Sequence, residues 1–552
     1  MDEKLTLPMA PLVSPSTKAA PRKRHAKSLA AGAAISAVAI LSLKHLSFSG
    51  SGAPQNPITN ARGSGDLRDW IAHEALFSER KIFDQLGPSV GAAEGLVVAS
   101  PSTSHPDYFY TWTRDSALVT ASIMDRLVAG ENGLEAALRL YTYSQAKLQN
   151  TCNRSGCPTD GGLGEPKFNV DGTPFEAEWG RPQRDGPALR AITLIRFANY
   201  LLDRGTNADH KFVSRFLYNQ DTSSGSSVIK NDLEYTSHLC FDSSFDLWEE
   251  KQDLHFFTLV ACRKALDSGA ALASRLDDLG AASWYQQQFN LMNSRILDSG
   301  AFHFPDGSYR AYANPENLGR RGVDSAVLLA ILAAGKAGDP NFGPTAPAVL
   351  ASVKVYVDAF RGKYSIANSS DQVFGLAPVP TGRYPEDKWD GYETGPDTMG
   401  NPWYLCTVAV PHLIDWALSE FMLAGNITVT DVSLPFFEQF VSSGDVFTRG
   451  STEFNLTVIG MRAWSDGFYK ILHQFQGPGG VLYEQFNRNT GEPQGASNLT
   501  WSFAAFADAA RARRTWRHLQ VNFKLYGATG LSTPLTLIVE FGLRQPQNAR
   551  CS

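Results

Sequence analysis

Two short segments of the chain place carboxylic acids directly beside aromatic side chains. The run Phe245-Asp246-Leu247-Trp248-Glu249-Glu250 holds three acids around one tryptophan, and Tyr483-Glu484-Gln485-Phe486 holds a glutamate between two rings. An apolar wall and a neighbouring like charge both raise the pKa of a carboxyl, so one acid of a pair can stay protonated while the other is ionised. Such a pair hydrolyses a glycosidic bond without a metal or cofactor. The two segments therefore predict a general acid and a general base.

A third segment, Tyr108-Phe109-Tyr110-Thr111-Trp112-Thr113-Arg114-Asp115, stands before a predicted helix. The adjacent guanidinium and carboxylate of Arg114 and Asp115 offer donors and acceptors that suit neighbouring sugar hydroxyls. The rings of the same segment offer flat apolar faces against which a sugar can stack. This combination is typical of a carbohydrate-binding site.

Each segment also has a purely structural explanation. Asp246 and Glu249 have the spacing of a capping box at the start of a helix predicted over 252–274. Glu484 fits an ordinary loop or edge-strand position, and Arg114 with Asp115 fits a buried ion pair. The residue types alone leave these alternatives open.

The composition excludes some classes of function. The 552 residues are 43% hydrophobic and 19% charged, which is typical of a soluble globular protein with a large core. A chain of this length can hold several domains or one large helical barrel. The net charge is −5 and no basic stripe crosses the body of the chain, so nucleic-acid binding is not expected. A neutral polysaccharide fits this charge better.

The cysteines do not have the paired spacing of a zinc site, and no metal is expected. Cys152 and Cys157 flank a short polar stretch and could close a local disulfide. Cys406 lies in an apolar run and is interpreted as a buried free thiol. The full set is Cys152, Cys157, Cys240, Cys262, Cys406 and Cys551.

Helical periodicity dominates the chain from residue 67 to about 513. Long loops rich in Gly, Pro, Asp and aromatic residues interrupt it at 150–185, 298–322 and 362–402, and loops of this length are usually functional. The pattern predicts a ring of helical hairpins with an open pocket at one end. The tail at 514–552 contains an alternating stretch that is expected to form a strand or two. The predicted helices include 67–85, 115–130, 133–148, 186–204, 252–274, 276–297, 323–336, 345–361, 403–424, 454–476 and 498–513.

The N-terminus has the three parts of a targeting segment. Residues 1–27 form a basic leader, 28–43 an apolar run and 44–66 a flexible linker. The apolar run is shorter than a comfortable membrane span but longer than most signal-peptide cores. An uncleaved signal-anchor and a cleaved signal peptide both remain open, and either one places the body in the lumen or outside the cell. The glycosylation sequons, which support this location, begin at Asn153, Asn368, Asn426, Asn455 and Asn498.

Several blocks of the sequence resemble those of fungal glucoamylases and occur in the same order. The resemblance extends from about residue 67 to 513. Its longest blocks are nearly unbroken, which makes chance similarity implausible. The blocks are YFYTWTRD at 108–115, GEPKFNVD at 164–171, WGRPQRDGP at 179–187, DLWEE at 246–250, RYPED at 383–387, NPW at 401–403 and EQF at 484–486.

The resemblance implies an all-α, six-hairpin (α/α) toroid barrel and an exo-acting, inverting hydrolase. Such enzymes cleave terminal α-1,4 links, and α-1,6 links more slowly, and release β-D-glucose. The matching positions make Glu249 the general acid and Glu484 the general base. For inversion, their carboxyls are expected roughly 6.5–9.5 Å apart, which leaves room for a water molecule.

The resemblance also assigns a set of substrate-binding positions. Arg114, Asp115 and Arg383 are expected to hold the terminal glucose, while Tyr108 and Trp179 form walls. The substrate is an α-glucan, the protein is expected to be a monomer, and the membrane is reached only through the N-terminal segment. The complete set of expected binding residues is Tyr108, Arg114, Asp115, Trp179, Asp246, Trp248, Glu250, Arg383 and Trp403.

Three features depart from the filamentous-fungal pattern. The loop between Asp387 and Asn401 is longer and is more similar to that of yeast members. The difference leaves open which sugars the site prefers on the leaving-group side of the cleaved bond. Gly495 stands where a hydroxyl residue is expected near the base, which predicts an altered rate or pH profile. The starch-binding module common in the family is not present in this sequence, so raw starch is expected to be a poor substrate.

Two rival hypotheses remain. Another helical-barrel glycosidase, such as a trehalase or a glucodextranase-like hydrolase, would share the fold and the acid–base pair but differ in the far wall of the site. A glucan-binding protein without activity would lack one of the two glutamates. Both Glu249 and Glu484 are present.

Overall fold

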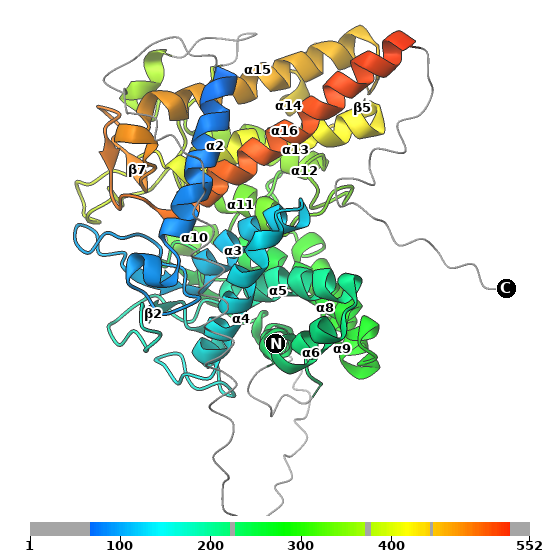
Figure 1. The fold of residues 1–552 in the computed structure, drawn as a ribbon. Coiled ribbons are helices and arrows are strands. Elements are labelled where there is room, and N and C mark those ends of the chain that lie inside the picture. Colours follow the sequence, from blue (N-terminus) through cyan, green and yellow to red (C-terminus); the bar gives the residue numbers. More distant parts are fainter. Residues whose placement is uncertain (1–66, 221–226, 370–376, 442–444, 530–552) are drawn as a thin grey trace, which may run out of the picture. The chain divides into compact units, whose positions relative to one another are not determined.

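The computed structural model of the protein describes residues 67–220, 227–369, 377–441 and 445–529, which are predominantly helical (Figure 1). Two kinds of long helix alternate along the chain. Helices of one kind are buried around most of their circumference, whereas most helices of the other kind bury one face and expose the rest. The first pattern belongs to a helix that is packed on all sides, and the second to a helix at the surface.

The helices of the first kind form a closed inner ring. Each one contacts the next in chain order, and the last contacts the first again. In α13, for example, 16 of the 21 residues are buried, including Asp415 in the middle of the helix. The inner helices in the described part of the chain are α3 (Thr113–Val128), α5 (Asp185–Arg204), α8 (Phe256–Arg275), α11 (Ala326–Ala334), α13 (Tyr404–Ala424) and α16 (Thr500–Thr529).

The helices of the second kind pack against the outside of this ring. In α9 the buried residues are Tyr285, Gln288, Met292 and Ile296, and this spacing keeps them on one face of the helix. One outer helix precedes each inner helix, which confirms the predicted six-hairpin (α/α) architecture for the described residues. The outer helices are α2 (Leu67–Asp84), α4 (Glu135–Gln149), α7 (Val228–Leu239), α9 (Leu279–Leu297), α12 (Pro347–Ala359) and α15 (Thr452–Phe475).

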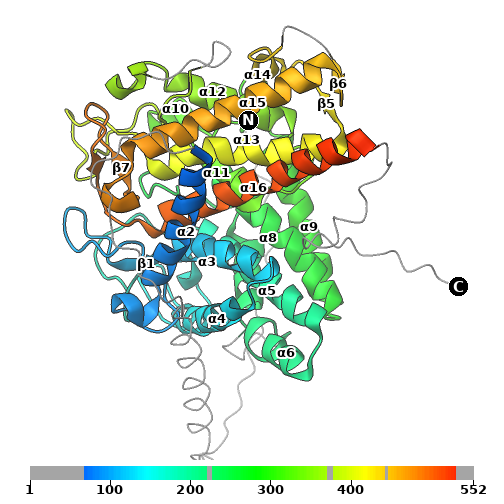
Figure 2. The same ribbon diagram turned by 45° about the horizontal axis from the view of Figure 1, so that its top comes forward.

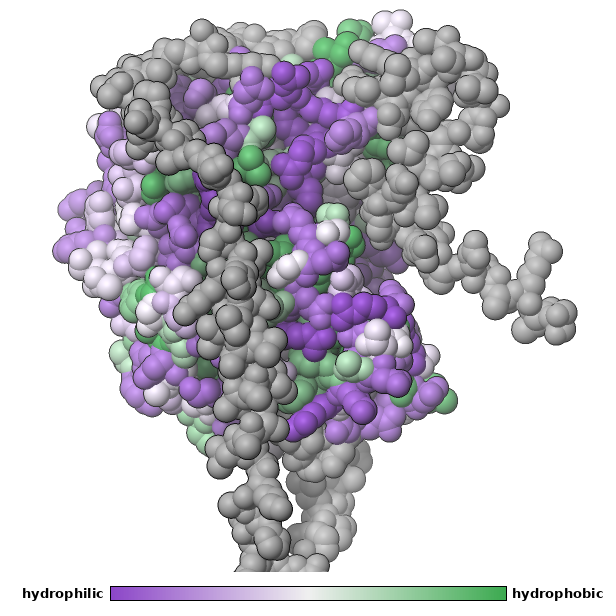
Figure 3. Space-filling view, in the orientation of Figure 1, coloured by the Kyte–Doolittle hydropathy of each residue, from purple (hydrophilic) through white to green (hydrophobic). Residues whose placement is uncertain are grey.

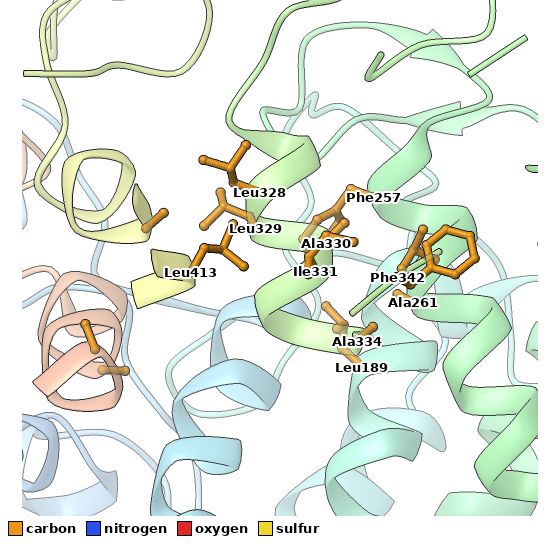
Figure 4. Packing of buried hydrophobic residues seen from close by; sticks show 14 of the residues in the cluster. Leu189, Phe257, Ala261, Leu328, Leu329, Ala330, Ile331, Ala334, Phe342 and Leu413 are labelled. Atoms are coloured by element: carbon orange, nitrogen blue, oxygen red, sulfur yellow. The ribbon is translucent and has the colours of Figure 1, made fainter. Parts of the chain in front are cut away.

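Apolar side chains fill the space between neighbouring inner helices. Figure 4 shows Leu329 of α11 beside Leu413 of α13, with Phe257 and Ala261 of α8 on the other side of the same helix. All four are at most 5% exposed. Burial of this kind contributes roughly 25 cal/mol per Å² of apolar surface, and it is the main force that holds the ring together.

Short elements occupy the connections. Three of the antiparallel strand pairs, β1–β2, β3–β4 and β7–β8, belong to segments that precede inner helices. Figure 1 shows β7 on the same side of the molecule as β2, and Figure 2 shows it on the same side as β1, which pairs with β2. The strands are β1 (Tyr110–Trp112), β2 (Lys167–Asn169), β3 (Ser244–Phe245), β4 (Gln252–Asp253), β5 (Asn426–Thr428), β6 (Val446–Thr448), β7 (Gln485–Phe486) and β8 (Pro493–Gln494), and the short helices are α6 (Asn207–Phe212), α10 (Pro315–Leu318) and α14 (Leu434–Phe437).

Most predicted helices are present within a few residues of their expected bounds, but two expectations were wrong. Helix α8 begins at Phe256, with His255 as its N-cap, so Asp246 and Glu249 do not form a capping box at its start. Helix α16 continues to Thr529, so residues 521–529 are helical rather than extended. Trp516 is fully buried and anchors this helix, and extending an existing helix costs little. Residues 530–552 lie outside the described part.

The cysteine expectations are confirmed where the structure describes them. Cys152 and Cys157 form a disulfide, as expected, and Cys406 is a buried free thiol. Cys240 and Cys262 form a second disulfide that the sequence had not indicated. Among the described residues, no helix is both long and apolar enough to cross a membrane. The apolar run at 28–43 lies outside the described residues.

Candidate active site

Most of the acids and rings singled out in the sequence lie in segments that precede inner helices, and Asp115 lies in the first turn of one; Asp185, which was not singled out, has a similar position. Trp112 is the residue before α3, Asp185 is the first residue of α5, and Trp403 is the residue before α13. Glu249 lies in the turn between β3 and β4, ahead of α8, and Glu484 lies directly before β7, ahead of α16. Hydrogen bonds from Trp112 to Glu249 and from Tyr108 to Glu484 show that these segments meet. Helix N-termini also favour negative charge.

A tight turn sets the position of Glu249. Its backbone has φ +67°, in the left-handed region that side chains other than glycine rarely adopt. The Asp246 carboxylate accepts hydrogen bonds from the backbone N–H groups of Glu250 at 2.8 Å and Lys251 at 3.0 Å. Arg320 in turn holds Asp246 at 2.7 Å. Asp246 is completely buried and therefore supports the turn from behind. Strain of this kind persists where surrounding contacts over-determine it.

The Glu249 carboxylate is held mainly by neutral donors. The indole N–H of Trp112 donates to Oε1 at 2.7 Å, and that of Trp179 donates to Oε2 at 2.8 Å. The Gln183 amide donates to Oε1 at 3.0 Å, and Arg114 Nη2 lies 3.5 Å from the same oxygen. Burial raises the pKa of Glu249, while Arg114 and Gln183 oppose that shift. The side chain remains 15% exposed, so it is accessible to a reacting group.

Glu484 is more deeply buried, with no exposed surface. Its Oε1 accepts hydrogen bonds from the Tyr108 hydroxyl at 2.8 Å and from the Trp389 indole at 3.2 Å. Among the described residues no donor reaches Oε2. Burial raises the pKa of Glu484 to about 7, and the hydrogen bonds from Tyr108 and Trp389 oppose the rise. A buried carboxylate oxygen without a partner is costly, and such an atom is suited to accept a proton.

Gly495 leaves room for this free oxygen. Its backbone has φ +74°, and a Cβ atom at this position would lie 2.3 Å from Glu484 Oε2. A side chain at 495 would therefore displace the carboxylate. The family resemblance predicts a hydroxyl residue at this position. The structure instead requires a glycine there, because Glu484 approaches the backbone so closely.

Arg114 is enclosed, whereas its neighbour Asp115 is not. The guanidinium donates to Gln183 at 2.7 Å and to Asp185 at 3.0 Å, and the residue is only 4% exposed. Its Nε lies 3.5 Å from the Asp115 carboxylate, of which 15% is exposed. Burial raises the pKa of Asp115 to about 6, although Arg114 opposes the shift. In this structure Arg114 therefore matches the buried ion-pair interpretation.

A second cluster of ionic groups surrounds Glu250. Arg383 donates to Glu250 at 2.8 Å and also binds Asp387 through Nε at 2.8 Å. The Tyr384 hydroxyl donates to the other Glu250 oxygen at 2.5 Å, and Arg320 pairs with that same oxygen. Arg383 is only 3% exposed, whereas 26% of the Glu250 side chain is exposed. Glu250 is thus the accessible member of this cluster.

The two tryptophans expected to bind substrate, Trp248 and Trp403, are both buried. The Trp248 indole donates to Asp324 at 3.0 Å, and its ring centroid lies 5.5 Å from that of Trp403. They are 8% and 6% exposed, so they support the site from within. Trp179 and Tyr108 are only partly buried.

Aromatic contacts connect the two glutamates. Tyr108, which donates to Glu484, has its ring centroid 5.6 Å from that of Trp112, which donates to Glu249. Sequence reasoning missed the contact of Trp389 with Glu484, because the two residues are 95 positions apart. The one available signal was an aromatic residue in the unusually long loop after Asp387.

Comparisons with known proteins agree with this geometry. The model of glycosyl hydrolases family 15 matches residues 78–511. Glucoamylase-1 of Schizophyllum commune is 39% identical over 85% of this chain and 77% of its own length. A probable glucoamylase of Schizosaccharomyces pombe is 35% identical over 81% of this chain and 92% of its own.

Solved structures agree as well. The glucoamylase of Saccharomycopsis fibuligera has a TM-score of 0.73 at 30% identity and covers 84% of this chain and 99% of its own. The family 15 glucoamylase of Hypocrea jecorina has a TM-score of 0.72 at 35% identity, over 82% of this chain and 74% of its own. The resemblance noted in the sequence and the predicted fold are thereby confirmed. With most of its length matched in both sequence and structure, this chain belongs to glycosyl hydrolases family 15.

Proposed function

We propose that the protein is a glucoamylase, which removes single glucose units from the non-reducing ends of α-glucans with inversion. The observation that carries the proposal is the pair of carboxyls formed by the partly buried Glu249 and the buried Glu484, on two different loops at one end of the helical ring. Each accepts its shortest hydrogen bond from a ring N–H or O–H donor, and the ion pair of Arg114 with Glu249 is longer, at 3.5 Å. The names of the family 15 relatives support the same activity.

The reaction follows from the two protonation states. Protonated Glu249 gives its proton to the glycosidic oxygen as the bond from that oxygen to C1 breaks, and the shortened glucan leaves as an alcohol. A water molecule attacks C1 from the opposite face and gives its proton to ionised Glu484. The product is β-D-glucose, and exchange of protons with solvent restores the starting state of both glutamates.

The surroundings of each glutamate suit its role. Burial favours the protonated form of Glu249, and the two indole N–H groups then stabilise the carboxylate that forms as its proton leaves. At Glu484, burial raises the pKa to about 7, and the hydrogen bonds from Tyr108 and Trp389 limit this rise, which helps to keep the ionised form that a base requires.

Exposure divides the expected binding residues into two groups. Tyr108, Asp115, Trp179 and Glu250 are partly exposed, and we assign them direct contact with the terminal glucose. The others act by holding this first group in place. They are the buried residues Arg114, Asp246, Trp248, Arg383 and Trp403.

The location of the protein is part of the proposal. We propose that the chain enters the secretory pathway through its N-terminal segment and acts there as a monomeric glycoprotein. Two disulfides and the exposed sequon residues Asn426 and Asn455 support this location. The face seen in Figure 3 carries mainly hydrophilic residues with hydrophobic ones scattered between them, as is common for a monomer.

The activity is tested by following maltoheptaose hydrolysis by proton NMR from the first minute. We expect β-glucose as the only small product. Glu249→Gln and Glu484→Gln should each lower kcat by about 10²–10⁴-fold, since each removes one proton-transfer group. Glu420→Gln changes a carboxyl that contacts Gly338 and Thr345, and it should leave kcat unchanged. Early α-glucose, or a mixture of shorter oligosaccharides, would contradict the proposal.

Trp389→Phe tests the environment of the base. The change removes an indole N–H that stabilises ionised Glu484, so the pKa of Glu484 should rise. Activity is lost as the pH falls through the pKa of the base. The acid limb of the kcat/KM profile should therefore move to higher pH, while the basic limb, which reports Glu249, stays in place. Movement of the basic limb alone would refute the assignment of the two roles.

Gly495→Ala should abolish most activity, because its Cβ would collide with Glu484 Oε2. We expect a loss in kcat on the order of 10²-fold from the displaced carboxylate. Gly479→Ala is the matched control, since Gly479 has φ +71° and nothing lies within 4 Å of its Cβ position. Both changes cost about 1–2 kcal/mol of backbone strain. The collision with Glu484 adds to the cost at 495, so the melting temperature of Gly495→Ala should fall at least as far as that of Gly479→Ala. Equal activities of the two variants would show that contact with Glu484 is unimportant.

The secretory location is tested on the full chain expressed in a fungal host. Treatment with peptide-N-glycosidase should increase its electrophoretic mobility, and Asn426→Gln combined with Asn455→Gln should reduce that change. An unglycosylated protein recovered from the cytosol with full activity would be the contrary result.

A further inference from the structure

Lys167 is a buried lysine in β2 that the proposed mechanism does not use. The residue is only 2% exposed. In the described part of the chain no carboxylate forms an ion pair with its ammonium group. Aromatic rings surround that group instead, and we call them the aromatic cage. Their centroids lie 3.6 Å (Trp179), 4.0 Å (Tyr110), 4.2 Å (Phe175) and 4.6 Å (Trp112) from Nζ.

A buried ammonium without a counter-ion is expensive, so the cage must offset its lost hydration. The face of an aromatic ring carries negative potential, and the attraction of a cation to it is strongest when the cation is desolvated. The rings of the cage also contact one another, with centroids 5.2 Å apart for Tyr110 and Phe175 and 5.6 Å apart for Phe175 and Trp179. Lys167 therefore lies at the centre of a packed aromatic group and fixes the orientation of its rings.

Two rings of the cage are the ones that hold Glu249. The Trp112 and Trp179 N–H groups donate to the two different oxygens of its carboxylate, at 2.7 Å and 2.8 Å. A cation against the face of an indole withdraws electron density from the ring, which makes its N–H a stronger donor. Lys167 thus acts on Glu249 through both indoles at once.

We propose that Lys167 is a positioning residue for the general acid: its ammonium group aligns Trp112 and Trp179 toward Glu249 and supports the carboxylate formed by proton transfer. This inference rests on the proposed role of Glu249. It assigns a function to the block at 164–171, which the mechanism otherwise leaves without one. The geometry of the cage carries the argument.

The charged groups around the two residues agree with this role. Lys167 is influenced by Glu249, Asp107 and Arg181, and burial lowers its pKa to about 8, so the ammonium remains charged at neutral pH. The pKa of Glu249 is raised by burial and lowered by Arg114, Gln183, Lys167 and Trp112. Other ionisable groups that interact electrostatically with Glu249 are Tyr108 and Asp115.

Lys167→Met tests the inference because methionine retains the length of the side chain and removes the charge. Without the cation the pKa of Glu249 should rise. The acid must be protonated to act, and activity is lost as the pH rises through its pKa. The basic limb of the kcat/KM profile should therefore move up by about one pH unit, and kcat should fall about tenfold. The acid limb, which reports Glu484, should not move.

Two further variants separate this role from a structural one. Lys167→Arg keeps a cation in the cage and should leave the basic limb near its wild-type position. Lys230→Met changes another buried lysine, which lies over the rings of Tyr218 and Tyr285 and pairs with Asp278. It should lower the melting temperature without moving either limb.

A Lys167→Met variant that folds, as judged by near-ultraviolet circular dichroism, but keeps the wild-type basic limb would overturn the inference. If Lys167→Met does not fold, the Lys167→Arg variant tests the inference. A shift of its basic limb by a full pH unit would then overturn the inference. Failure of the proposed function is recognised separately. If the proposed function is wrong, the Glu249→Gln variant remains active. If Glu249→Gln is inactive but Lys167→Met has the wild-type pH profile of kcat/KM, only the role of Lys167 is rejected.

Discussion

The removal of two carboxyl groups from water is the constraint on which the site depends. Burial raises the pKa of both Glu249 and Glu484, and at Glu249 the Arg114 guanidinium, 3.5 Å away, opposes that rise without cancelling it. The shortest hydrogen bonds to both carboxylates come from indole and phenol donors, which stabilise the ionised form only moderately. Neutral donors on rigid rings therefore keep each glutamate able to change its protonation state. Because rings have few rotatable bonds, they also hold the oxygens in a defined orientation.

The closed ring of inner helices makes this arrangement possible. Each inner helix is buried on most sides, so its N-terminal end has little freedom to move. The segments that carry Trp112, Glu249 and Glu484 are attached to such ends. Apolar packing between the helices thereby offsets the cost of a strained turn at Glu249 and of an unpartnered oxygen at Glu484. Behind the site, the ionic cluster around Arg320 and Glu250 gives the turn a rigid support.

Much of the fold could be predicted from the sequence. Helical periodicity is a local property, and it located nearly all the long helices, although α7 was missed. The capping-box interpretation of Asp246 and Glu249 was wrong because a pair of short strands, β3 and β4, occupies that position. The tail was assigned to strands because its residues alternate, yet the helix containing Trp516 continues into it. In the first case strand pairing overrode a local pattern, and in the second an existing helix was simply extended.

For the site, the sequence by itself determined the residue types: two glutamates beside aromatic rings, in blocks that identify the family. Only the tertiary structure decided which atoms meet. Tyr108 and Glu484 are 376 positions apart, and Trp389 and Glu484 are 95 apart, yet both pairs are hydrogen-bonded. The sequence also could not show that Lys167 lies within four rings. Periodicity and motifs encode contacts between near neighbours in the chain, whereas these contacts exist only because the helical ring closes and brings its loops together.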